Sequence, residues 1–168
     1  MAKKCNLTIP EGADAKKWEE ARKRREELAL SYSRQKEALF SPEGAEVLRY
    51  LKEVRGYSEE LIRDMGLGYI SPAEARLLEE RCKVGIAWKA EEYPLSIAYF
   101  SRGHVMGFKF RYITPIEGKP KYMNTRSLGS EGMDSNPFGL TPQSLLLEDK
   151  KKKVVVVEGE LDALHAIA

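Results

Sequence analysis

The chain has 168 residues, of which 42% are hydrophobic and 32% charged, so it can form one ordinary domain or a small domain with part of another. Its 28 basic and 26 acidic residues give a formal net charge of +2, which is too small to identify a nucleic-acid-binding protein. Cys5 and Cys82 have no CxxC partner, which excludes a zinc ribbon, predicts no zinc and argues against a structural disulfide. No apolar run approaches the roughly 18 residues of a membrane span, so we expect a cytoplasmic protein without a membrane partner.

Residues 1–40 are predicted to be a charged helical extension. From residue 13 onward the sequence is dense in Glu, Lys and Arg, and its apolar residues form only a thin helical stripe of Trp18, Ala21, Leu28, Tyr32 and Leu39. The basic run at 22–25 is flanked by glutamates that largely cancel its field. This pattern favours a solvated helix that leans on the domain or on a partner, rather than an arm that binds nucleic acid.

Residues 41–81 carry the signals of three short helices. Their predicted starts are Ser41 before Pro42, then Ser58, then Ser71 with Glu74 at capping-box spacing. Glycines at 56, 66 and 68 mark the ends of the first two helices, and the third should run to about Arg81. We therefore predict a small helical subdomain.

Residues after Cys82 follow a strand pattern. Strands are expected at 86–88, 95–100 and 105–113, with a hairpin turn at 101–104, a loop at 114–120 and an extended piece at 121–124. Within 105–113, Phe108 and Phe110 alternate with Lys109 and Arg111, which places apolar and basic side chains on opposite faces. Together with the helices, these strands predict an α+β fold with an antiparallel sheet.

The stretch 154–168, VVVVEGELDALHAIA, predicts a buried strand that ends at Glu158-Gly159 and leads into a helix. The carboxyl edge of such a strand is where ligands and metals gather in open α/β sheets. Asp162 follows Glu158 by one helical turn, and two carboxylates suit a hard cation such as Mg²⁺. The alternative is a capping glutamate with an aspartate favoured by the helix dipole. We expect the valine run to pair with strands between Leu95 and Ile113 or with a neighbouring molecule, or else to be poorly ordered.

A second group of candidate residues is basic and lies on or beside the strand pair: Lys109, Arg111, Lys119, Lys121 and Arg126. Tyr112 and Tyr122 accompany them. Cations interleaved with aromatic rings can hold a phosphate backbone and stack a base, as in single-stranded DNA binding. An ordinary solvated sheet face is the alternative.

Three segments, in this order, resemble the catalytic core of bacterial DnaG-type DNA primases and their phage relatives. They are YLKEVRGYSEELIRDMGLGYI, then FSRGHVMGFKFRYI with KPKYMNTRS, and finally VVVVEGELDALHA, which resembles the first motif of a Toprim domain. The resemblance spans roughly Ser41 to Ala168. It implies that residues 41–150 form the N-terminal subdomain of the core and that 151–168 begin an incomplete Toprim α/β domain.

The resemblance also implies roles for individual residues. Glu158 looks like the Toprim glutamate that performs metal-linked acid/base work, with Asp162 as the aspartate that follows it and Mg²⁺ (or Mn²⁺) as the cofactor. Arg111, Lys121 and Asn124 resemble residues that line the template and nucleotide groove. The full candidate set for nucleic-acid or nucleotide binding is Lys109, Arg111, Lys121, Tyr122, Asn124 and Arg126.

The implied function is part of a primase core that binds single-stranded DNA template and NTPs for RNA primer synthesis, with a replicative helicase as a fused or separate partner. Toprim sites use a later Asp-x-Asp pair that is not in this sequence, so we expect no primer synthesis by this chain alone. A Toprim-type nuclease or mobilisation protein and a non-catalytic single-stranded DNA-binding module are the alternatives.

The chain departs from the family pattern at several positions. Lys109 and Phe110 stand where two glycines are usual, Glu160 stands where an aromatic residue is common, and residues 124–127 replace the usual NSPET. The family's zinc ribbon is missing, which favours a phage, plasmid or mobile-element variant, or a fragment of a longer chain.

Overall fold

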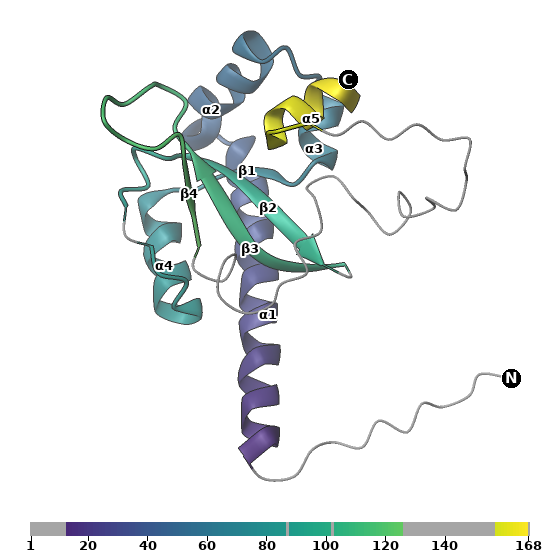
Figure 1. The fold of residues 1–168 in the computed structure, drawn as a ribbon, viewed down its shortest axis with the longest axis vertical. Helices are drawn as coiled ribbons and strands as arrows, with labels where there is room; N and C mark the ends of the chain where they lie inside the picture. Colours follow the sequence, from purple (N-terminus) through teal and green to yellow (C-terminus); the bar gives the residue numbers. More distant parts are fainter. Residues whose placement is uncertain (1–12, 87, 102, 126–156, 168) are drawn as a thin grey trace, which may run out of the picture.

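In a computed structural model of the protein, the structure describes residues 13–86, 88–101, 103–125 and 157–167. Helices and a single sheet share these residues, which confirms the predicted α+β class (Figure 1). The helical elements are α1 (Ala13–Leu39), the 3-10 turn η1 (Pro42–Gly44), α2 (Ala45–Arg49), the π-helical turn η2 (Tyr50–Val54), α3 (Glu59–Asp64), α4 (Pro72–Cys82) and α5 (Glu160–Ile167). The strands are β1 (Leu67–Tyr69), β2 (Leu95–Ser101), β3 (His104–Arg111) and β4 (Tyr122–Asn124).

The four strands form one antiparallel sheet in the order β1-β2-β3-β4. Leu67, Ile97, Lys109 and Asn124 lie opposite one another across the sheet, and so do Tyr69, Leu95, Arg111 and Tyr122. Because residues that pair across neighbouring strands point to the same face, these two rows share one face. The row between them, Gly68, Ser96, Phe110 and Met123, points to the other.

Helices α1 and α4 cover that second face. Phe108 and Phe110 of β3 are fully buried there, in a core that includes Leu28 of α1 and Leu78 of α4. Gly68 permits the close approach of α1, since a Cβ at this position would lie 3.0 Å from the Cβ of Gln35. Figure 1 shows that only the C-terminal half of α1 packs in this way, while the N-terminal half extends beyond the rest of the described structure.

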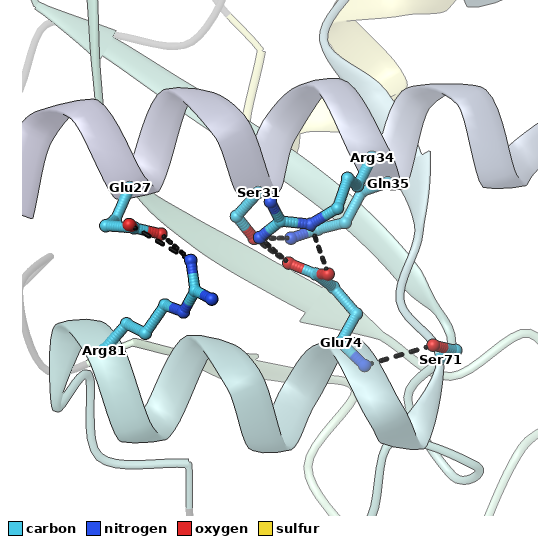
Figure 2. A network of polar contacts seen from close by, with 7 residues as sticks. All are labelled: Glu27, Ser31, Arg34, Gln35, Ser71, Glu74 and Arg81. Atoms are coloured by element: carbon cyan, nitrogen blue, oxygen red, sulfur yellow. Dashed lines mark hydrogen bonds and ion pairs between the residues drawn. The ribbon is translucent and has the colours of Figure 1, made fainter.

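A polar network on Glu74 joins α1 to α4 (Figure 2). The buried Glu74 carboxylate accepts a 2.6 Å hydrogen bond from the Ser31 hydroxyl and bonds of 2.7 and 3.0 Å from the Arg34 guanidinium. Gln35 donates to Ser31 at 2.8 Å, which completes the chain of bonds along α1. The predicted cap is present, because Ser71 accepts from the Glu74 N–H at 3.2 Å, but the Glu74 side chain is bound by α1.

The helical subdomain and α5 cover the first face of the sheet. Their shared core contains fully buried side chains from the helices and from the sheet: Leu39, Val47, Leu51, Ile62, Leu67, Leu95, Ile97, Leu161 and Leu164. The two leucines of α5 complete this core, although they lie more than fifty residues beyond the strands they contact. The helix predicted after Glu158-Gly159 is confirmed.

Several predicted elements differ in the structure. The strand predicted at 86–88 is absent from residues 86 and 88, because Lys83 adopts a left-handed conformation (φ 49°) and the Glu79 carboxylate binds the N–H groups of Gly85 and Ile86 at 2.7 and 2.9 Å. Gly66 ends α3, but Gly68 lies in β1, a strand that the sequence did not predict. The helix after Ser41 is divided into η1, α2 and η2.

The apolar stripe predicted along α1 holds only in its second half. Leu28 and Leu39 are buried, whereas Trp18 is half exposed. The predicted strand at 154–157 lies almost entirely outside the described residues, and Val157, its one described member, is exposed and not in a strand. No helix within the described ranges is both long and apolar enough to cross a lipid bilayer.

Candidate nucleic-acid interface and metal site

The candidate binding residues of the sheet lie on the face that α5 covers in part. Lys109 of β3 pairs with Asn124 of β4, and Arg111 pairs with Tyr122, so all four side chains start from one face. Lys121 immediately precedes β4 and is exposed, as is Asn124. The antiparallel register therefore brings together residues that are ten or more positions apart in the sequence.

Tyr122 is the centre of a cationic cluster. The Lys109 Nζ, the Arg111 Cζ and the Lys121 Nζ lie 4.8, 5.1 and 5.8 Å from the centroid of its ring. Each of these cations is close enough to interact with the π-system. We call Arg111, Lys121 and Tyr122 the Tyr122 cluster. Lys109 is left out of this name because its ammonium also bonds to the Glu160 carboxylate.

Arg111 is fixed in this cluster by two phenols. Its two terminal nitrogens donate to the Tyr122 hydroxyl at 2.7 Å and to the Tyr50 hydroxyl at 3.2 Å. Only 7% of Arg111 is exposed, and its Nε has no hydrogen-bond partner among the described residues. Burial raises the pKa of the Tyr122 phenol, Arg111 lowers it, and the carboxylates of Glu160 and Asp162 raise it, so both acids of α5 act on the cluster electrostatically.

Glu160, in the first turn of α5, connects this helix to the sheet. Its carboxylate accepts hydrogen bonds from the Lys109 ammonium of β3 and the Tyr99 hydroxyl of β2, and only 7% of the residue is exposed. Burial opposes ionisation, but the bonds from Lys109 and Tyr99 outweigh it and hold the pKa of Glu160 below its usual value. Burial and then the bond to Glu160 raise the pKa of Tyr99.

Two more contacts hold the start of α5. The Tyr57 hydroxyl donates a 2.5 Å hydrogen bond to the Leu161 carbonyl, and Arg55 lies 3.6 Å from the Asp162 carboxylate. Glu158 precedes the helix and is exposed, and the Asp162 side chain is 62% exposed. Both candidate metal ligands are therefore open to solvent at the start of α5.

The residues at the start of α5 fit part of a magnesium site. Glu158 and Asp162 provide hard oxygen donors, and Mg²⁺ commonly binds one or two carboxylates while it keeps several waters. A Cβ on Gly159 would lie 3.0 Å from Asp162 Oδ2, so the glycine leaves open the space beside that carboxylate. Among the described residues no three His, Cys, Asp or Glu side chains gather as a metal cluster, and Asp162 is also paired with Arg55.

Known proteins resemble this chain in sequence and in fold. No family model matches the sequence. The chain is 32% identical over 167 residues to the DNA primase of Synechococcus elongatus, an alignment that covers 84% of this chain and 23% of that protein. A solved structure of the DnaG catalytic core superposes with a TM-score of 0.57 at 20% identity, over 86% of this chain and 50% of that one.

The chain has the fold of a DnaG-type primase catalytic core. A second solved structure, the DnaG primase catalytic domain bound to single-stranded DNA, matches with a TM-score of 0.52 at 20% identity, over 64% of this chain and 38% of that one. The chain thus spans about a quarter of the curated relative and at most half of these solved structures.

Within this primase-type fold, the structure brings most of the predicted residues into one region. Lys109, Arg111, Lys121 and Tyr122 contact one another or a common ring, Asn124 is in register with Lys109, and Asp162 lies on the adjacent helix. Arg126 lies outside the described residues.

The sequence did not predict a role for Glu160, Tyr99, Tyr50 or Arg55. One signal was present, because Lys109 and Glu160 both depart from the pattern of the primase family and prove to be bonded to each other. Tyr50 and Arg55 carry no comparable signal, since their contacts depend on how η2 packs against β3 and how the residue after it meets α5.

Proposed function

We propose that this chain is part of a DNA primase catalytic core that binds single-stranded DNA template and nucleotides for RNA primer synthesis in DNA replication. The observation that carries this proposal is the Tyr122 cluster, a group of cations around one aromatic ring beside the acids of α5. The primase-type fold and a fold relative solved with single-stranded DNA support it.

The Tyr122 cluster and the neighbouring Asn124 offer complementary contacts to single-stranded DNA. Lys121 is exposed and can neutralise a phosphate, and the amide of Asn124 can donate to a phosphate or to a base edge. The half-buried Tyr122 ring offers a face to a base or to a ribose. Arg111 is held by Tyr50 and Tyr122, so its fixed charge would act on bound phosphates without losing side-chain entropy. Arg126 follows β4 in sequence and remains a candidate contact to the same single-stranded DNA.

The metal belongs to the proposal as well. Glu158 and Asp162 would hold Mg²⁺ (or Mn²⁺), which would neutralise nucleotide phosphates beside the Tyr122 cluster. The segment 151–168 is proposed as the start of a Toprim domain after a primase subdomain at 41–150. NTPs as substrates, a replicative helicase as partner and a cytoplasmic location complete the proposed setting.

Single-stranded DNA binding tests the function directly. A fluorescent oligodeoxythymidine is titrated with the protein at 50–200 mM NaCl, and the slope of log K against log salt counts the phosphates that are neutralised. Lys121→Met should lower this slope by about 0.7, the value for one phosphate on a single strand. Tyr122→Leu should weaken binding at every salt concentration, and Tyr122→Phe, which keeps the stacking ring but removes the hydroxyl that holds Arg111, should retain most of the affinity and the slope.

Lys23→Met is the matched control. Lys23 is an exposed lysine on the extended half of α1, ion-paired with Glu19 at 3.2 Å, and it lies outside the Tyr122 cluster. Its replacement should leave both affinity and slope unchanged. Equal losses in Lys23→Met and Lys121→Met would show that binding follows net charge, and the proposed interface would be rejected.

A further inference from the structure

The contacts of Lys109 separate it from the other cations of the sheet. Its ammonium bonds to the Glu160 carboxylate, whose side chain is only 8% exposed. The other Glu160 oxygen, Oε2, is buried without a partner in the described residues. The buried negative charge of Glu160 is therefore stabilised by Lys109 and Tyr99. If Lys109 bound a phosphate instead, that charge would lose its cationic partner.

The same contacts restrain the start of α5. Glu160 is bonded to β2 through Tyr99 and to β3 through Lys109, and the next residue, Leu161, is held through its carbonyl by Tyr57. Two successive residues of α5 are thus hydrogen-bonded to other parts of the fold, Glu160 to the sheet and Leu161 to Tyr57 between η2 and α3. Glu158 lies two residues before Glu160, and Asp162 lies two residues after it.

We propose that Glu160 is a positioning residue, which uses Lys109 and Tyr99 to hold the first turn of α5, with Glu158 and Asp162, beside the Tyr122 cluster. Lys109 then holds α5 through Glu160 and does not contact phosphate. It is therefore removed from the candidate nucleic-acid-binding residues. This inference rests on the proposed function of the Tyr122 cluster and of the two carboxylates.

The first test counts phosphates. Lys109→Met with Glu160→Gln removes the pair without changing the net charge or much side-chain volume. The salt slope for oligodeoxythymidine should remain that of the unmodified protein, while Lys121→Met loses about 0.7. A loss of similar size in the Lys109→Met, Glu160→Gln variant would show that Lys109 contacts phosphate and would overturn the proposal.

The second test measures the carboxylates without any catalytic assay. Mn²⁺ binding is followed by electron paramagnetic resonance in Tyr99→Phe, which removes one hydroxyl from the Glu160 carboxylate and keeps the ring. Ser31→Ala is the matched control, because it removes one hydroxyl from the buried Glu74 carboxylate on the opposite face. Tyr99→Phe should weaken Mn²⁺ binding by several fold, and Ser31→Ala should leave it within twofold.

The outcomes separate this inference from the function on which it rests. Equal Mn²⁺ affinities in Tyr99→Phe and the unmodified protein, or equal losses in Tyr99→Phe and Ser31→Ala, would overturn the positioning role. No Mn²⁺ binding by the unmodified protein would remove the metal from the proposed function and would overturn the positioning of the two carboxylates with it, while the salt slope of the Lys109→Met, Glu160→Gln variant would still decide whether Lys109 contacts phosphate. An unchanged slope in Lys121→Met would reject the interface itself.

Discussion

The network on Glu74 allows a sharp test of what joins α1 to α4. The same two helices carry two arginine–glutamate pairs, Arg34–Glu74 and Arg81–Glu27 (Figure 2). The Glu74 side chain is 11% exposed and that of Glu27 is 28% exposed, while the two arginines are similarly open at 38% and 48%. The pairs therefore differ chiefly in the burial of the carboxylate.

Replacing Arg34 by Met should cost about 2 kcal/mol of unfolding free energy. Removal of one partner from a fully buried pair costs roughly 3–5 kcal/mol. The cost is reduced here because water reaches the partly exposed Arg34 site and Ser31 still donates to Glu74. The same change at Arg81 removes a more exposed pair and should cost at most about 1 kcal/mol. In a chain of this size, 2 kcal/mol corresponds to a fall in melting temperature of roughly 4–8 °C.

Thermal and urea unfolding, followed by circular dichroism, would measure both variants. Arg34→Met combined with Glu74→Leu should recover most of the loss, because no charge is then left buried. Arg34→Met and Arg81→Met with equal effects would refute the reasoning, since burial of the acceptor would then have no influence on the cost.

Two further predictions concern the core behind the sheet. Gly68→Ala should destabilise the protein by about 1–3 kcal/mol, because the new Cβ would lie 2.7 Å from Ser96 Oγ and 3.1 Å from the Gln35 carbonyl carbon, and an unchanged urea midpoint would contradict the close approach of α1. In a Cys5→Ser background, the Cys82 thiol should react with a disulfide reagent at pH 8 on the order of 100-fold more slowly than in urea, because it is buried and burial raises its pKa. Equal rates in buffer and urea would show that Cys82 is accessible in the folded protein.

Local signals in the sequence predicted elements whose cause is local. Ser58 and Ser71 were predicted as helix caps, and each accepts a hydrogen bond of 3.2 Å from an N–H in the first turn. The β2–β3 hairpin was predicted from its alternation and its turn, and Phe108 and Phe110 are buried as expected. Caps, turns and alternation act over a few residues, so a single sequence reveals them.

Elements that depend on distant partners were not predicted. β1 is three residues long and contains Gly68, so its strand character comes from pairing with β2 and not from propensity. The apolar segment 86–88 has the composition of a strand, but the Glu79 carboxylate binds the backbone N–H groups of Gly85 and Ile86. Lys109 and Glu160 were noted as separate departures from a family pattern, and only the fold shows that they meet across 51 positions.

The burial of α5 decides where the chain can be divided for expression. Leu161 and Leu164 are fully buried against the helical subdomain and the sheet. A fragment that stopped at residue 150 would expose the apolar surface that these leucines cover, and such a surface promotes aggregation. Ribosomes also synthesise α5 after the sheet and the helical subdomain, so the part of the first face that Leu161 and Leu164 cover stays exposed until residue 164 has left the exit tunnel. A stable fragment of this subdomain should therefore retain α5.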